Sequence, residues 1–297
     1  MKLSESVSPE SLPVLPISSE RDQARTIDRI AALWKKGDLV VYLGPDLYDG
    51  PQDIPLDPLS LANLLGSRVA VPGRLSGRLH EVAQYIESHK HRKTLLALME
   101  EIFRKKGAPA PVHRLLRECP VPLVVDTWYA PASTELLVET EDFQISGVSR
   151  AEYRDRWSRM DRKTPGGWEP VEEVPPGARV LYRPFGTMDP GVEVLVSDAD
   201  FVEVLTEIDI QTPIPSWVQS HRRGRHFLFL GCRFDNQTSR IFARQIMKRS
   251  SESHFVVGVG TPTNKERLFY EREGILRLPV ALNGQFLPEL EKRLREH

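Results

Sequence analysis

The stretch Phe227-Leu228-Phe229-Leu230-Gly231-Cys232-Arg233 joins a short apolar run to a glycine that ends it. A run of this length, bounded by a turn signal, is typical of a strand that is buried on both faces of a sheet. Strands of this kind occur in parallel sheets that carry helices on both sides. The glycine either turns the chain or lets backbone N–H groups approach a phosphate closely.

Three further segments repeat this plan of an apolar run with a polar or glycine-rich end: residues 39–46, 121–129 and 254–260. Stretches with apolar residues at helical spacing precede or separate them, as in residues 19–37 and 238–249. Alternating apolar strands and amphipathic helices favour a mainly parallel sheet that is covered on both faces. The sequence therefore predicts an α/β, Rossmann-like fold with a helical and irregular insert.

The segments around these strands suggest how the chain is organised. Residues 1–18 are rich in proline and predict an extended N-terminal arm, and residues 19–297 predict one α/β domain. Within it we expect a helical part at about 59–118 and an irregular insert at about 150–178, where Gly, Pro and Trp interrupt a charged segment.

Local signals predict where several helices begin and end. Ser19 and Ser60 are expected to cap the first two helices, and Gly37 is expected to end the first. Apolar residues at helical spacing predict one long helix from about Gly77 to Lys106.

Composition narrows the classes of partner. Forty Lys and Arg residues stand against 41 Asp and Glu residues, which gives a net charge of -1. No overall field then favours nucleic acid or an anionic membrane. We therefore expect neither of these as a partner, whereas a protein partner or a homo-oligomer stays open.

Cysteine and histidine usage predicts a reduced protein without a metal. Cys119 and Cys232 are too few for a disulfide scaffold or a zinc ribbon. His89 and His91, two residues apart, do not share a helix face, so a metal site with His80 is not expected.

The N-terminus lacks the pattern of a secretory signal, and no run of 18 apolar residues occurs, so we expect a cytoplasmic protein.

Ligands of open parallel sheets bind outside the carboxyl ends of the strands. Four segments supply such ends, namely Gly44-Pro45-Asp46, Asp126-Thr127-Trp128-Tyr129, Gly231-Cys232-Arg233 and Gly258-Val259-Gly260. The residues predicted to bind a cofactor there are Gly44, Pro45, Asp46, Thr127, Gly231, Cys232, Arg233 and Gly260.

The order of these segments resembles the sirtuin-like family, and more closely its bacterial branch without a zinc module. The segment Leu43 to Tyr48 is similar to the family's first glycine motif, and His113-Arg114-Leu115-Leu116 to its His-x-Leu-Leu helix. Residues 125–129, 183–187 and 197–201 resemble the motifs that follow, and residues 227–235 resemble Leu-Phe-Leu-Gly-x-Ser-x-x-Asp. The resemblance spans residues 39–260 and implies a site for NAD or a related adenine nucleotide.

The chain departs from the family at the positions that carry the chemistry. Active members hold the nicotinamide ribose with Asn and Asp of the second motif and use His of the third as general base. Here Thr127, Tyr129 and Phe185 stand at these positions, and a phenyl ring cannot accept a proton. Asp46 also replaces a glycine, and its carboxylate would repel a pyrophosphate. The resemblance thus implies a degenerate, non-catalytic member that binds a nucleotide or a partner protein.

Several alternatives stay open. An enzyme that cleaves NAD, as a glycohydrolase or deacylase, would have to recruit another group, such as Asp126, His80 or Cys232. Cys232 is either a reactive thiolate beside Arg233 or a small apolar residue at a strand end. The basic run 221–226 either binds an anionic surface or forms a solvated turn.

A finer resemblance concerns the biological role. The segments YRPFGTMDP and FLFLGCRF and the run from Leu195 to Pro215 are similar to sirtuin-like proteins encoded beside bacterial nitrogen-fixation genes. This similarity implies an accessory role in nitrogen fixation.

Overall fold

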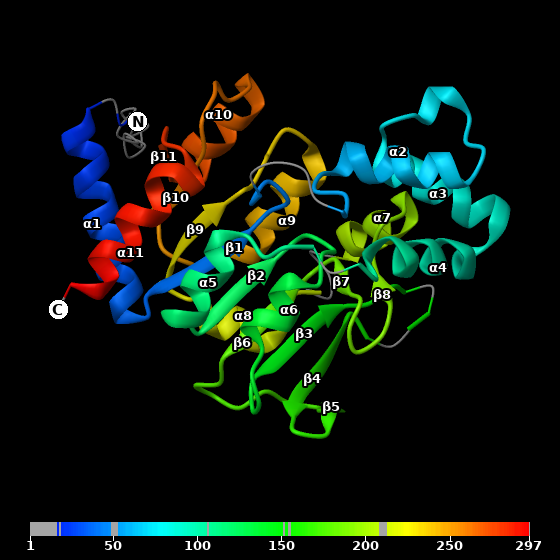
Figure 1. Cartoon of the computed structure of the whole chain (residues 1–297), viewed down its shortest axis with the longest axis horizontal. Helices are drawn as coiled ribbons and strands as arrows, with labels where there is room; N and C mark the ends of the chain where they lie inside the picture. The colour runs from blue at the N-terminus through cyan, green and yellow to red at the C-terminus, as the bar shows by residue number, and fades with distance from the viewer. Residues whose placement is uncertain are drawn as a thin grey trace, which may run out of the picture.

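A nine-stranded sheet forms the centre of the computed structural model, which describes residue 17 and residues 19–48, 53–105, 107–150, 152–153, 156–207 and 213–296 (Figure 1). Its order is β11 (Ile275–Leu278), β10 (His254–Val257), β9 (His226–Leu230), β1 (Leu39–Leu43), β2 (Leu123–Asp126), β6 (Val180–Arg183), β3 (Phe143–Gly147), β4 (Ser158–Thr164) and β5 (Gly167–Pro170). Every neighbouring pair from β11 to β3 is parallel, whereas β4 pairs antiparallel with both β3 and β5. The predicted Rossmann-like, mainly parallel sheet is confirmed.

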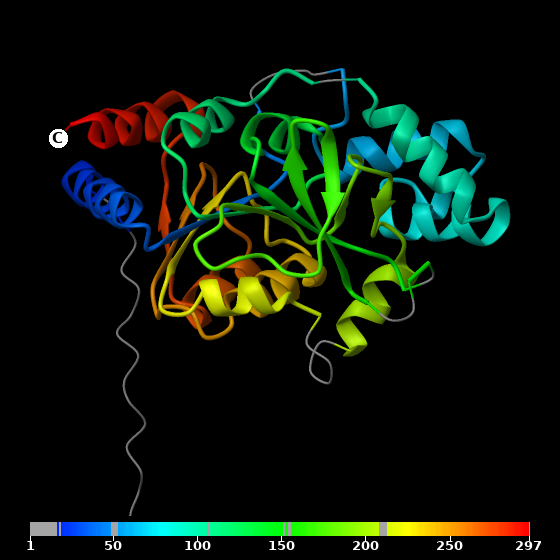
Figure 2. The same cartoon turned by 90° about the horizontal axis from the view of Figure 1, so that it is seen from below.

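Helices cover both faces of the sheet because its strands are apolar on both sides. In β1, Leu39, Val41 and Leu43 pack into one core, and Val40 and Tyr42 pack into the other. The first core is closed by α1 (Glu20–Lys36), α5 (Pro111–Glu118), α6 (Ala132–Leu137) and α11 (Leu287–Arg295), which follows the π-helical turn Leu282–Phe286. The second is closed by α8 (Ser216–His221), α9 (Gln237–Met247) and α10 (Asn264–Arg272). In Figure 2 the red C-terminal helix lies on one side of the sheet and the yellow helices lie on the other.

A helical lobe lies beside the carboxyl ends of the central strands. It comprises α2 (Pro58–Arg68), the short 3-10 turn Gly73–Leu75, α3 (Leu79–Lys90) and α4 (Arg92–Phe103), and it is drawn in cyan in Figure 1. Its core includes Trp128 and Tyr129, which follow β2, and Val194 of the small hairpin β7 (Gly186–Thr187) and β8 (Glu193–Val194). Phe201 of α7 (Asp198–Glu207) packs nearby against Leu195. The lobe and the strand ends therefore enclose a common space.

Most predicted elements are confirmed, and their capping explains their limits. Ser19 accepts a hydrogen bond from the N–H of Asp22 at the start of α1, and Gly37 ends this helix with φ 72°. The cap predicted at Ser60 is wrong, because Asp57 caps α2 and Ser60 is the third residue of the same capping box.

Three expectations differ from the structure. The long helix predicted from Gly77 to Lys106 is broken at His91, where φ is 69° and ψ is 152°, into α3 and α4. The insert at 150–178 is not irregular throughout, because β4 and β5 form a hairpin there. Strand β3 was not predicted, since its sequence FQISG mixes polar and apolar residues.

One predicted segment falls largely outside the described residues, and another does so in part. The N-terminal arm is described only at Ile17, which is buried, and residues 208–212 of the run from Leu195 to Pro215 lie outside as well. Among the helices of the described part of the chain, none is long and apolar enough to cross a lipid bilayer.

Candidate functional site

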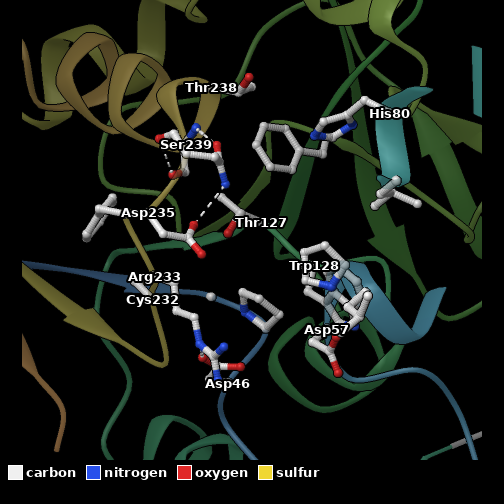
Figure 3. A pocket seen from close by; sticks show the side chains of 18 of the residues that line it. Asp46, Asp57, His80, Thr127, Trp128, Cys232, Arg233, Asp235, Thr238 and Ser239 are labelled. Carbon is white, nitrogen blue, oxygen red and sulfur yellow. Dashed lines mark hydrogen bonds and ion pairs between the residues drawn. The ribbon is translucent and has the colours of Figure 1, made fainter. Parts of the chain in front are cut away.

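A pocket of about 300 Å³ opens where the carboxyl ends of β1, β2 and β9 face the helical lobe (Figure 3). The strands supply the loops that follow them, and the lobe supplies Asp57, Gly77 and His80. The start of α9 adds Thr238 and Ser239. Convergence of strand ends at one edge is the expected place for a ligand in an open parallel sheet.

Most of the residues singled out in the sequence meet at this pocket. The lining includes Gly44, Pro45, Asp46, Thr127, Tyr129, Phe185, Cys232 and Arg233. Gly231 lies next to it, and its carbonyl accepts a hydrogen bond from the N–H of Asp46 at 2.9 Å. Within the described residues, Gly260 is not part of the lining, and its carbonyl instead accepts from Arg277 at 2.7 Å.

The glycines at the strand ends serve close packing of two loops. A Cβ on Gly44 would lie 2.3 Å from the carbonyl oxygen of Gly231, and one on Gly231 would lie 2.7 Å from the carbonyl carbon of Asp46. Gly231 also has φ +63°, which favours glycine. The first loop and the loop after β9 therefore contact each other directly, and of the two interpretations of these glycines the contact favours close packing of the chain over approach to a phosphate.

The backbone N–H groups at these strand ends are already used. Gly44 donates to Leu230 at 2.9 Å, and the N–H of Thr127 donates to Leu43 at 3.0 Å. Asp46 donates to Gly231, as described above, and Pro45 has no N–H. Residues 44–46 and Thr127 thus have no spare backbone donor for an anion.

The positions that correspond to the family's ribose-binding residues make internal contacts. The Thr127 hydroxyl donates to the carbonyl of Leu43 at 2.9 Å, and the Tyr129 hydroxyl donates to that of Leu195 at 2.7 Å. Both side chains are buried, and burial raises the pKa of Tyr129 far above its ordinary value. Neither side chain replaces the missing Asn and Asp.

Phe185 stands in an aromatic cluster at the pocket wall. Its ring meets those of Phe201 and Phe242 edge to face, with centroids 5.2 Å and 5.0 Å away. Such packing fixes an aromatic ring but offers no lone pair for a proton. The wall therefore lacks a base at this position.

Arg183 positions the wall formed by Trp128 and Tyr129, and sequence reasoning missed this role. Its guanidinium is fully buried and donates to the carbonyls of Trp128 at 2.6 Å and Ala130 at 3.0 Å. Asp126 lies 4.0 Å away and accepts the N–H of Trp128 at 2.9 Å. The only signal in the sequence was an arginine directly after an apolar strand.

Of the three groups considered for catalysis, only His80 remains suitable. Burial lowers the pKa of His80, so its ring is neutral near pH 7. Its Nδ1 lies 3.0 Å from the carbonyl of Val196, which can only accept, so Nδ1 carries the hydrogen and Nε2 is left as an acceptor. Burial raises the pKa of Cys232 well above its ordinary value, which opposes a thiolate, and Asp126 is not part of the lining.

Arg233 and Asp46 form an ion pair at the pocket, with Arg233 Nε bonded to the Asp46 carboxylate. Burial raises the pKa of Asp46, and the Arg233 charge opposes this shift. The pair lies at the lower side of the opening in Figure 3. Of the lining residues that the structure describes, the one guanidinium is thus already matched by a carboxylate.

The basic run at 221–226 is partly structural. Arg222 is buried, and it donates to the carbonyls of Gln245 and Ile246; Arg225 donates to Gly37 at 3.1 Å. Two of its cations therefore hold the fold and are not presented to an anionic surface. In the part of the chain that is described, no group of three or more metal-ligating side chains occurs.

Comparison with known proteins identifies the family of this chain. The family model described as SIR2-like domain matches residues 122–277, which is more than half of the chain. The chain belongs to the SIR2-like domain family. A solved structure from a study of the structural basis for the mechanism and regulation of Sir2 enzymes is 12% identical to this SIR2-like protein, with a TM-score of 0.45. The match covers 91% of this chain and 98% of the chain of the solved structure. A search of the curated proteins found no match.

Two parts of NAD, the cofactor that the resemblance implies, are poorly matched by the residues of this SIR2-like pocket. Its pyrophosphate would meet the carboxylate of Asp46 and would find no free backbone N–H at residues 44–46. Its nicotinamide ribose would find Thr127 and Tyr129 engaged with carbonyl groups. A flat ring, in contrast, would find aromatic walls at Trp128 and Phe185.

Proposed function

We propose that this SIR2-like protein binds a nucleotide-related ligand in its pocket without cleaving NAD, and that it acts as an accessory or regulatory module. The observation that carries the proposal is Phe185, packed among Phe201 and Phe242 where the resemblance calls for a general base. Loss of a positioned base costs about a hundredfold to ten-thousandfold in rate.

Two measurements test this proposal together. Pure protein is incubated with NAD, and nicotinamide release is followed; we expect no release above that of heat-inactivated protein. Thermal unfolding is then followed with a panel of nucleosides and nucleotides. At a hundred times its dissociation constant, a ligand adds about 2.7 kcal/mol to the free energy of unfolding. Turnover of NAD, or a panel without any stabilising member, contradicts the proposal.

A second candidate function, an NAD glycohydrolase or deacylase, is favoured by His80. This ring lines the pocket and presents an unprotonated Nε2, as a general base requires. Nicotinamide release that is lost in His80→Gln and kept in His89→Gln would establish the enzyme. His89 serves as the control because it bonds its own helix at Tyr85 and does not line the pocket.

The biological setting forms a further part of the proposal. The similarity of three segments to proteins encoded beside nitrogen-fixation genes supports an accessory role there, through a protein partner or a homo-oligomer. Co-purification of the tagged chain from cells grown with and without fixed nitrogen tests this role. A set of bound proteins that is the same under both conditions speaks against it.

A further inference from the structure

The charges around the pocket are unbalanced. Asp46, Asp57 and Asp235 line it, and among the described residues of the lining Arg233 is the one Lys or Arg side chain. His80 is neutral near pH 7 because burial lowers its pKa. The lining therefore has a formal excess of two negative charges. A phosphate brought here meets net repulsion, which is stronger near a protein surface than in bulk water.

The arrangement of these carboxylates makes the repulsion hard to avoid. Asp46 and Asp57 lie on the side of the pocket opposite Thr238 and His80, with Asp235 between them and the start of α9 (Figure 3). Asp57 is held in place, since its carboxylate accepts the N–H of Ser60 at 2.9 Å. A ligand that reaches the centre of the pocket is thus close to an acidic side chain on more than one side.

Several donors that could offset this charge are already bonded. The backbone N–H groups of Gly44, Asp46 and Thr127 are bonded to carbonyls of neighbouring strand ends. The Arg233 guanidinium is bonded to Asp46. The N–H of Ser239, in the first turn of α9, donates to the side chain of Asn236 at 2.8 Å. An anionic group that used these donors would first have to break their present contacts.

The walls suit an uncharged aromatic ring. Trp128, Tyr129, Phe185 and Phe234 all contribute to the lining. Pockets with mostly apolar walls and a few polar groups commonly hold ring systems, which the polar groups orient. Carboxylates at the rim can accept hydrogen bonds from amino and hydroxyl groups.

We infer that the pocket selects a phosphate-free aromatic ligand of neutral or positive charge, of the nucleoside class, and that Asp46 determines this specificity by engaging Arg233. The inference rests on the proposed function, because it names the ligand class of the same pocket. It differs from the family's expected cofactor in excluding the pyrophosphate.

Isothermal titration of the full chain with adenosine, AMP and ADP at low ionic strength tests the inference. Affinity is expected to fall with each phosphate, by about tenfold or more between adenosine and ADP, because the ligand charge grows more negative. Added salt should narrow this difference, since it screens the exposed carboxylates.

Two variants probe the specificity residue. Asp46→Asn removes one negative charge and releases Arg233, so ADP should bind at least about fivefold more tightly while adenosine changes by less than about twofold. Asp235→Asn, on the exposed loop before α9, should improve ADP binding in the same direction. Asp38→Asn is the matched control. It changes the net charge by the same amount, and Asp38 lies before the amino end of β1, at the end of the strand away from the pocket.

The outcomes separate the two proposals. ADP or NAD binding more tightly than adenosine to the unmodified protein would overturn the inference and leave the proposed function standing. An equal response of ADP binding to Asp46→Asn and Asp38→Asn would overturn the role of Asp46. If no adenosine compound binds while another nucleoside of the thermal-unfolding panel does, the same series is repeated with that nucleoside and its phosphates; if no member of the panel binds, the proposed function itself fails. The series on the unmodified protein decides the ligand class even if a variant does not fold.

Discussion

At the scale of single residues, Arg183 shows how a buried charge can shape a site without entering it. Its side chain reaches the carbonyls of Trp128 and Ala130, so the loop after β2 is fixed on both sides of Tyr129. It also donates to the Thr134 hydroxyl at 2.9 Å. Removal of a charged partner from such a setting leaves several buried polar groups unsatisfied.

Arg183→Met keeps most of the side-chain volume and removes the guanidinium. We expect a loss of about 3–5 kcal/mol in the free energy of unfolding, because two carbonyls lose their donor and Asp126 loses the opposite charge beside it. Urea denaturation of the variant and of the unmodified protein measures this loss in the free energy of unfolding. Arg74→Met is the control, since Arg74 is exposed, and it should stay within about 0.5 kcal/mol. A loss for Arg183→Met that is no larger than the control value would show that the guanidinium does not support the loop.

Which residues meet at the site was largely predictable, whereas what they do there was not. The ends of parallel strands lie at one edge, so Gly44, Thr127 and Cys232 could be placed together from sequence. The backbone N–H groups of Gly44 and Thr127 are bonded to carbonyls of neighbouring strand ends because the loops pack closely. No local sequence pattern encodes this packing. Arg183 was missed for a similar reason, since an arginine at a strand end is buried or exposed according to its tertiary surroundings.

At the scale of elements, the loop after β1 and the loop after β9 form one packed unit. Their contact requires glycine at two positions, and it places Asp46 next to Arg233. Apolar runs and caps predicted most strands and helices. The break between α3 and α4 was not predicted, because the apolar stripe continues across it and His91 itself is no helix breaker.

Gly44→Ala tests the packing of the two loops. The added methyl group would lie 2.3 Å from the Gly231 carbonyl oxygen, well inside the van der Waals contact distance, so we expect a cost of about 1–3 kcal/mol in the free energy of unfolding. Gly66→Ala, in α2, meets nothing within 4 Å and should instead stabilise by about 0.5–1 kcal/mol. Chemical denaturation measures both, and a neutral Gly44→Ala would refute the close contact.

His91→Gly tests the break between α3 and α4. At φ 69° and ψ 152°, His91 occupies a region that is open mainly to glycine, so the variant should gain about 1 kcal/mol of stability. His89→Gly, two residues earlier in the last turn of α3, should lose about 0.5–1 kcal/mol. Thermal unfolding of both variants compares the two effects, and a shift in the same direction would argue against the break.

At the scale of the whole molecule, the strand order was only partly predictable. The alternation of strands and helices indicated a parallel sheet, but β3 to β5 extend it with a hairpin whose residues are charged. Folding also buries several histidines. Those with lowered pKa include His80, His113 and His254, each chiefly because of burial.

Buried neutral histidines make stability depend on pH. Burial lowers the pKa of His254 to about 4, and its Nδ1 accepts the N–H of Phe227 at 3.0 Å, which requires an unprotonated nitrogen. As the pH falls below about 6.5, the unfolded chain binds a proton that the folded chain cannot, so stability falls. His254 alone should account for about 2 kcal/mol between pH 7 and pH 5.

His254→Asn isolates this effect, because an asparagine carbonyl oxygen can accept the same hydrogen bond without titrating. Carboxyl groups with raised pKa, such as Asp161 and Glu203, contribute in the opposite sense, so the comparison is between variant and parent. Urea titrations at pH 7, 6 and 5 should show a smaller loss in the variant. Identical slopes would mean that His254 titrates normally in the folded protein.

The edge of the sheet formed by β5 affects how readily two molecules of the protein can pair through their strands at high concentration. β5 is the edge strand on this side, and its last residue, Pro170, has no N–H that could donate a hydrogen bond to a strand of another molecule. An extended segment from another molecule would therefore find an interrupted ladder instead of a template. Pro170 therefore opposes fibril-like stacking of molecules along this edge of the sheet.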